Sequence, residues 1–258
     1  MRWKSFLMFL ALVLAAGWSL AQDPDNLIPR LKAEAYRSYY GQGQAVDFAR
    51  AYRLYLAVAE QGDADSQYVV GGMLYKGMGV DADRRAGFKW LLQAAEQGKV
   101  SPESLSIIGS MYLRGELVPL NYLEAKKWLT LAADQGSMSA QNDLAYLLFN
   151  GLGGERDMEK ALELYQKAAL QGDLMAQANT GLMYATGQGT DRDKARGYAW
   201  YSLAASRGSA FATVNRNNLM IDMTWEELNQ AQAISVDLYR QIEKITAAKP
   251  GPGEGIAP

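Results

Sequence analysis

The side chains of this sequence that could perform acid–base chemistry are carboxylates and tyrosines, because the chain contains neither His nor Cys. Their absence excludes Ser/His/Asp and Cys/His nucleophiles, and also a zinc site built from Cys and His. A pair of carboxylates could still serve as acid and base, as in glycosidases. However, Glu60, Glu96 and Asp134 occupy one position of a recurring pattern, which indicates surface residues. We therefore expect no catalytic residues, and a carboxylate-dependent hydrolase is the least favoured alternative.

Two other patterns look like ligand-binding motifs but lack essential parts. The Gly-x-Gly pairs that begin at Gly77, Gly151 and Gly187 follow no predicted strand and precede no Lys-Ser/Thr, so they do not form a phosphate loop. The Asp-x-Asp pairs that end at Asp83 and Asp193 lack the further ligands and closing Glu of a calcium loop. We expect the glycines to form turns and the second Asp of each pair to cap a helix, with no cofactor and no metal.

The elements that carry these residues follow from a glycine that recurs with a period of about 36 residues, the signature of a repeat protein. The five glycines are Gly62, Gly98, Gly136, Gly172 and Gly208. Fifteen residues before each stands an Asp or Asn, which caps helix N-termini well. These five residues are Asp47, Asp83, Asn121, Asp157 and Asp193. Apolar residues lie between the two ends at helical spacing, so each interval predicts a helix that the glycine ends.

A second glycine lies twenty-one residues before each of these and predicts the end of a preceding helix. The five are Gly41, Gly77, Gly115, Gly151 and Gly187. A small residue followed by two apolar residues recurs within these helices and forms a packed face. The repeating unit is therefore a pair of helices, and the extra residues around Val100–Pro102 are expected in a loop.

On the first helix of each pair, the positions nine, five and two before the closing glycine share one side. They are Tyr68, Gly72 and Tyr75; Ser106, Ser110 and Leu113; Asn142, Tyr146 and Phe149; and Ala178, Leu182 and Ala185. A solvated face should be charged, yet none of these residues is. We hypothesise that the stripe contacts a partner through Tyr68, Tyr75, Ser106, Ser110, Asn142, Tyr146, Phe149 and Leu182. A peptide, an amphipathic helix or a stacked sugar chain would suit it, and the structural alternative is that some of these residues only pack between repeats.

Several strings resemble the Sel-one-like (Sel1-like) repeat family, which is related to the tetratricopeptide repeat. They are GGMLYKGMGV from Gly71, WLLQAAEQG from Trp90, WLTLAADQG from Trp128 and GLMYATGQG from Gly181. The resemblance covers residues 29–208 and implies a right-handed α-solenoid that acts as an adaptor or scaffold for other proteins. It also implies that the first helix of each pair lines the concave surface. Bacterial relatives are often exported and linked to envelope or signalling tasks.

The N-terminus has the pattern of a secretory signal peptide. Arg2 and Lys4 precede the apolar run Phe6–Ala16, and Ser19-Leu20-Ala21 matches a small-x-small cleavage site. The run is shorter than the roughly 20 residues of a membrane span, so we expect residues 1–21 to be removed and the mature chain not to insert into a membrane. We expect the protein in the periplasm or outside the cell.

The C-terminal part departs from the repeat. Thr224 and Glu227 form a capping box ahead of an amphipathic pattern. We therefore expect capping helices over residues 209–248, which cover the last apolar face, and a disordered tail over residues 249–258.

The pattern predicts an all-α protein of five helix-turn-helix repeats over residues 22–208 with a C-terminal cap, and the family resemblance implies that the repeats form a right-handed α-solenoid. We expect a non-catalytic protein-binding scaffold of the cell envelope, and a glycan or peptidoglycan module is the alternative. The formal net charge of −2 and the lack of a basic stripe argue against a nucleic-acid partner.

Overall fold

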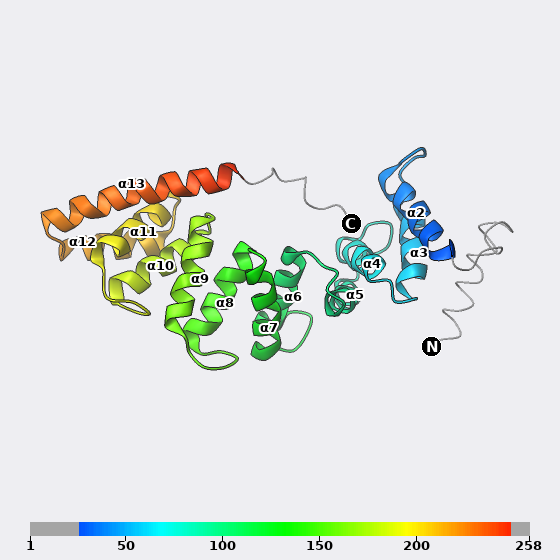
Figure 1. The fold of residues 1–258 in the computed structure, drawn as a ribbon, viewed down its shortest axis with the longest axis horizontal. Coiled ribbons are helices and arrows are strands. Elements are labelled where there is room, and N and C mark those ends of the chain that lie inside the picture. Colours follow the sequence, from blue (N-terminus) through cyan, green and yellow to red (C-terminus); the bar gives the residue numbers. More distant parts are fainter. Residues whose placement is uncertain (1–25, 249–258) are drawn as a thin grey trace. The chain divides into compact units, whose positions relative to one another are not determined.

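The computed structural model describes residues 26–248, and within that range the chain contains helices and no strand (Figure 1). The all-α repeat fold is therefore confirmed. The predicted signal peptide (1–21) and the predicted tail (249–258) lie outside the described residues. No helix within residues 26–248 has both the length and the apolar character that crossing a membrane would require.

The chain divides between Ser101 and Pro102 into two compact units. Unit 1 contains α2 (Leu27–Tyr40), α3 (Phe48–Ala59), α4 (Ala64–Lys76) and α5 (Arg84–Glu96). Unit 2 contains α6 (Pro102–Arg114), α7 (Tyr122–Asp134), α8 (Met138–Asn150), α9 (Met158–Leu170), α10 (Leu174–Thr186), α11 (Lys194–Ser206), α12 (Ala210–Ile221) and α13 (Trp225–Ala247). We call α2, α4, α6, α8 and α10 the A-helices, and α3, α5, α7, α9 and α11 the B-helices.

The predicted caps set the helix ends. Every B-helix begins directly after its Asp or Asn, whose side chain accepts a backbone N–H of the first turn. The A-helix glycines that directly follow helices α2, α4, α8 and α10 are left-handed C-caps, with φ between 69° and 72°. The B-helix glycines also have positive φ. Both sets of turns are confirmed, because L side chains rarely adopt this conformation and glycine adopts it without strain.

Small residues at the helix contacts let each A-helix approach its B-helix closely. A Cβ on Gly71 would come within 2.7 Å of Leu91 Cγ on α5, and one on Gly109 within 2.6 Å of Leu129 Cγ on α7. The Gly-x-Gly turns pack against the preceding B-helix instead, since a Cβ on Gly153 would lie 2.5 Å from the carbonyl oxygen of Tyr122 at the start of α7. These glycines are packing residues, which confirms the turn interpretation.

A glutamine pair links the two helices of some repeats. The residue after α9, Gln171, donates from Nε2 to Gln141 Oε1 of α8 at 2.7 Å, and Gln97 makes the same bond to Gln67 at 2.8 Å. The acceptor residues are buried. In the α6–α7 repeat the acceptor position is occupied by Leu105, so this link is absent there.

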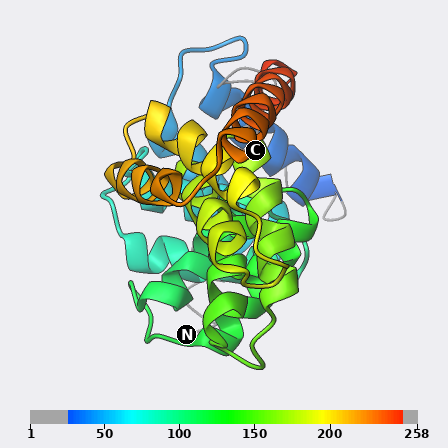
Figure 2. The ribbon, with the colours of Figure 1, turned by 90° about the vertical axis from the view of Figure 1, so that its left-hand side faces the viewer.

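The C-terminal cap consists of two helices with different roles. The capping box at Thr224 and Glu227 is confirmed, and α12 precedes it as a separate helix that the sequence pattern did not delimit. α13 runs beside the last repeats, against α11 and reaching α9 (Figures 1 and 2). Accordingly, α11 has buried Ala199 and Leu203 where α9 has the charged Glu163 and Lys167.

Candidate binding surface on the A-helices

Unit 2 holds the predicted stripe residues at different depths. Ser106 is only 3% exposed, and its hydroxyl lies 2.8 Å from the Ser139 hydroxyl of α8. Leu182 is half-buried and packs against the apolar cluster that contains Tyr201 and Leu219. Ser106 does not reach the surface, which corrects its assignment to the partner-binding stripe. The reason is that the neighbouring A-helix covers this position.

A carboxylate that the stripe hypothesis left out lies beside the central stripe residues. Ser110 Oγ donates to Asp143 Oδ2 at 2.6 Å, and Asn142 Nδ2 lies 3.4 Å from Asp143 Oδ1. The Asp143 side chain is 14% exposed, and Arg114 is 3.9 Å from it. Burial raises the pKa of the Tyr165 hydroxyl, and the negative charge of Asp143 adds to that effect. The surface here is polar and charged, although the stripe itself is neutral.

The three stripe residues of α8 differ in what a partner could reach. Tyr146 is 47% exposed. Asn142 Oδ1 is buried and accepts no hydrogen bond within the described residues. Phe149 is half-buried, and the guanidinium of Arg156 lies 5.4 Å from its ring centroid, so one face is already occupied. Tyr146 therefore has the exposed surface that the stripe hypothesis needs, whereas the Asn142 Oδ1 is enclosed and offers a partner no contact.

In unit 1 the stripe continues onto α2, which the hypothesis omitted. The same three offsets, counted from Gly41, give Lys32, Tyr36 and Tyr39. The spacing from Gly41 alone could have identified these three residues. The first helix lacks the other residues that recur in the later A-helices, and the stripe was therefore assigned only from the second repeat onward. Lys32 also adds a charge to a stripe that the later repeats keep neutral.

Tyr36 and the predicted Tyr68 lie on one cleft of about 470 Å³, which we call the tyrosine cleft. Its lining is Lys32, Ala33, Tyr36, Tyr55, Asp65, Tyr68 and Val69. Tyr55 comes from the B-helix α3, and its position in the cleft could not be read from the A-helix pattern. The other predicted unit 1 residue, Tyr75, lies outside this lining, with the Arg84 guanidinium 5.5 Å from its ring centroid.

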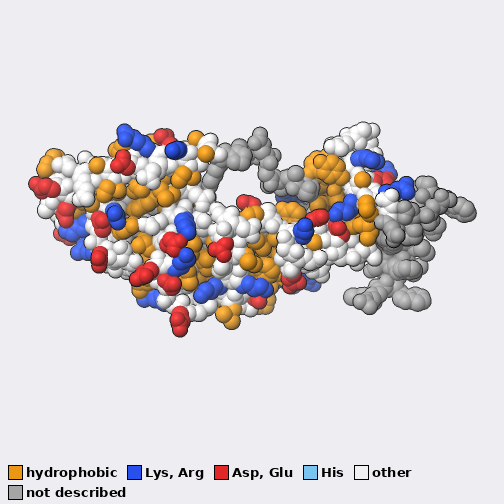
Figure 3. All heavy atoms as spheres, viewed as in Figure 1, with side chains coloured by type: hydrophobic (Ala, Val, Ile, Leu, Met, Phe, Trp, Pro, Cys, Tyr) orange, Lys and Arg blue, Asp and Glu red, His pale blue; other side chains and the backbone are white. Residues whose placement is uncertain are grey.

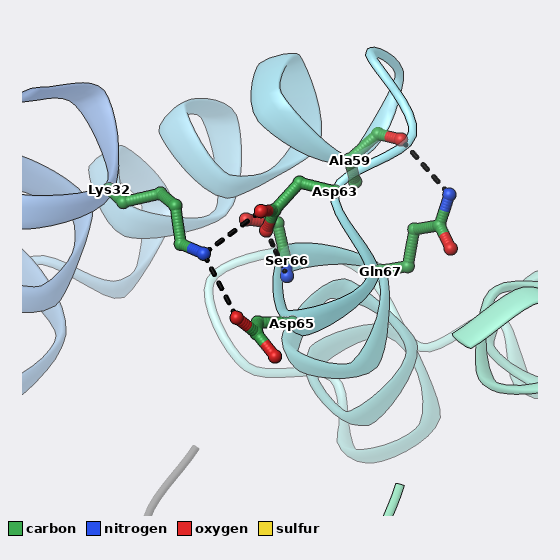
Figure 4. Close-up of polar contacts among 6 residues, drawn as sticks. All are labelled: Lys32, Ala59, Asp63, Asp65, Ser66 and Gln67. Atoms are coloured by element: carbon green, nitrogen blue, oxygen red, sulfur yellow. Dashed lines mark hydrogen bonds and ion pairs between the residues drawn. The ribbon is translucent and has the colours of Figure 1, made fainter. Parts of the chain in front are cut away.

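One corner of the tyrosine cleft is an ion-pair triad (Figure 4). Lys32 Nζ lies 2.9 Å from Asp63 Oδ2 and 3.1 Å from Asp65 Oδ2. Burial opposes charge on Lys32, but the hydrogen bonds to both aspartates outweigh it and raise the Lys32 pKa. Burial likewise tends to raise the pKa of Asp63, but hydrogen bonds from Ser66 and Lys32 prevail and lower it. Lys32 and Asp63 are therefore both charged at neutral pH.

These arrangements suit recognition better than catalysis. Within residues 26–248, no group of carboxylates is placed to hold a metal ion. On the face of unit 2 seen in Figure 3, acidic and basic side chains are interspersed, without an extended area of one sign. Exposed aromatic rings and short polar networks are the features that stand out.

The comparisons with known proteins agree with the repeat pattern. A family model described as the Sel1 repeat matches residues 33–63, 64–99, 102–137, 139–173 and 174–209. These five segments follow the five pairs of A- and B-helices. The chain belongs to the Sel1 repeat family. Proteins of this family generally act as protein-interaction scaffolds and are generally non-catalytic.

Two solved structures resemble the chain over most of its length. A Sel1 repeat protein from Oxalobacter formigenes is 26% identical, with a TM-score of 0.54 over 88% of this chain and 97% of that one. The protective antigen c5321 of uropathogenic Escherichia coli strains is 24% identical, with a TM-score of 0.52 over 90% of this chain. This chain spans 58% of that antigen's length, and the likeness shows the fold alone. No curated protein matches the sequence.

Proposed function

We propose that this protein is an exported, non-catalytic scaffold of the cell envelope that binds a protein partner on its A-helix surface. The observation that carries the proposal is the unused contact capacity of that surface in unit 2. Tyr146 is 47% exposed on α8, the helix that also carries Asn142 and Asp143. Such a ring can cover a partner's apolar side chain, and the Tyr hydroxyl can form a hydrogen bond with the partner's backbone. Membership of the Sel1 repeat family supports a protein as the partner.

Export and envelope location rest on the N-terminal pattern of residues 1–21 alone. Cell fractionation followed by N-terminal sequencing tests this part. We expect a mature chain that begins at Gln22 in the periplasm or the medium. A chain that retains Met1 in the cytoplasm would contradict it.

Crosslinking in intact cells followed by mass spectrometry tests the binding surface. We expect Tyr146→Ala to weaken or remove specific crosslinks while thermal unfolding is unchanged, since this ring is exposed. Leu131→Ala is the matched control, because Leu131 is a similarly exposed (44%) apolar side chain on the B-helix α7. Equal crosslinks for wild type and Tyr146→Ala would contradict the proposal. Pelleting with insoluble peptidoglycan, without protein crosslinks, would favour the glycan alternative.

A further inference from the structure

The charged groups at the tyrosine cleft of unit 1 do not balance. Lys32 is the only cation and Asp65 the only anion among the described residues that line it, and Asp63, which is not part of the lining, also pairs with Lys32. One ammonium charge therefore faces two carboxylates, which leaves one negative charge uncompensated. The Asp65 side chain is 60% exposed, compared with 24% for Asp63, so this charge is accessible at Asp65.

Aromatic rings from two A-helices stand close to this charge. Tyr36 of α2 is 39% exposed and Tyr68 of α4 is half-buried, and both line the cleft. Tyr36 is supported from behind by Tyr40, whose ring centroid is 4.5 Å from its own. The face of an aromatic ring carries negative partial charge and attracts cations. A carboxylate beside such rings strengthens that preference.

A third group supplies a hydrogen bond that the protein itself does not use. Tyr55 is only 5% exposed and lines the cleft, and its hydroxyl makes no hydrogen bond to the described residues. Burial raises the pKa of Tyr55, so the group is a neutral O–H donor at physiological pH. Because Tyr55 lines the cleft, a bound chain can reach this hydroxyl. A carbonyl oxygen of that chain would accept its hydrogen bond.

We infer that the tyrosine cleft binds a peptide segment of a partner protein through a Lys or Arg side chain. The cation lies against Tyr36 and Tyr68 and pairs with Asp65, and the Tyr55 hydroxyl donates to a backbone carbonyl of the peptide. This inference rests on the proposed function, because it assigns to one A-helix surface the kind of segment it takes.

The test uses the purified protein and three blocked pentapeptides that differ only in a central Arg, Gln or Glu. Affinities are measured by NMR titration at millimolar peptide concentration. We expect the Arg peptide to bind about tenfold more tightly than the Glu peptide, with the Gln peptide between them. Equal affinities for Arg and Glu, or binding of none of the three, would overturn the inference.

Two variants separate the side-chain contact from the backbone contact. Asp65→Asn is expected to lower the affinity for the Arg peptide about fivefold and to leave the affinity for the Gln peptide unchanged. Tyr55→Phe is expected to lower the affinity for both peptides by the same factor, since the Tyr55 hydroxyl contacts the backbone of the peptide and not its central side chain. Tyr201→Phe is the matched control, because Tyr201 occupies the same repeat position in α11 and is 1% exposed. Loss of binding in that control would assign the Tyr55 effect to packing and contradict the assigned contact.

The two proposals can fail separately. If Tyr146→Ala changes the crosslinks in cells while the three peptides bind equally, the scaffold function stands and the specificity of the tyrosine cleft does not. If Tyr146→Ala leaves the crosslinks unchanged but Asp65→Asn selectively lowers the affinity for the Arg peptide, the binding surface lies in unit 1 instead.

Discussion

The glutamine pair of the α8–α9 repeat allows a quantitative test of how these repeats are held together. Gln171 Nε2 donates to Gln141 Oε1 at 2.7 Å and to the Gly136 carbonyl at 3.2 Å. Gln141 is 5% exposed, and its own Nε2 donates to the Ala133 carbonyl at 3.4 Å. Gln171→Ala would therefore leave an amide oxygen buried without its donor.

The size of the effect follows from that orphaned acceptor. An unsatisfied buried polar group costs about 1–3 kcal/mol. Gln171 is itself half-buried, so water can enter part of the space that its truncation opens. We therefore expect a loss of about 1–2 kcal/mol in the free energy of unfolding. For a protein of this size that lowers the Tm by roughly 2–8 °C.

Urea and thermal unfolding followed by circular dichroism measure this loss. Gln135→Ala is the matched control, because Gln135 has the same repeat position but faces Leu105, which offers no acceptor. We expect that control to change stability by less than about 0.5 kcal/mol. Adding Gln141→Leu to Gln171→Ala removes the orphaned acceptor, since Leu105 occupies the equivalent position in the α6–α7 repeat, and should recover part of the loss. Equal costs for the two alanine variants would refute the reasoning.

Three further predictions concern other parts of the chain. Gln177 Oε1 is buried without a donor because Arg207 replaces the usual glutamine, so Arg207→Gln should raise the free energy of unfolding by about 1 kcal/mol in urea titrations. Gly71→Ala should lower the Tm through its clash with the facing leucine of α5, whereas Gly72→Ala, which meets nothing within 4 Å, should raise it slightly; equal shifts would contradict the packing account. Because the pKa of Asp63 is lowered, its stabilisation is present above about pH 4 and is lost as the pH falls further. Asp63→Asn keeps the helix cap, so its stability deficit at pH 7 should shrink below pH 4 in unfolding measured against pH.

Much of the fold could be predicted because its determinants are local. Asp157 begins α9 and Gly172 ends it through contacts within one or two turns, so residue type and spacing suffice to place them. The binding surface is less local. The offsets that found Tyr68 also select Ser106, and the same spacing cannot tell an exposed ring from a hydroxyl covered by the next helix.

The sequence by itself determined the repeating helix pairs, their caps and the absence of His and Cys chemistry, because these depend on residue type and short-range spacing. Only the tertiary structure decided which residues meet. It placed Tyr55 of a B-helix beside Tyr36 and Tyr68 of two A-helices, and it placed α13 beside α11. Such neighbours belong to different helices, and burial and charge at a surface depend on packing between helices rather than on the order of residues within one.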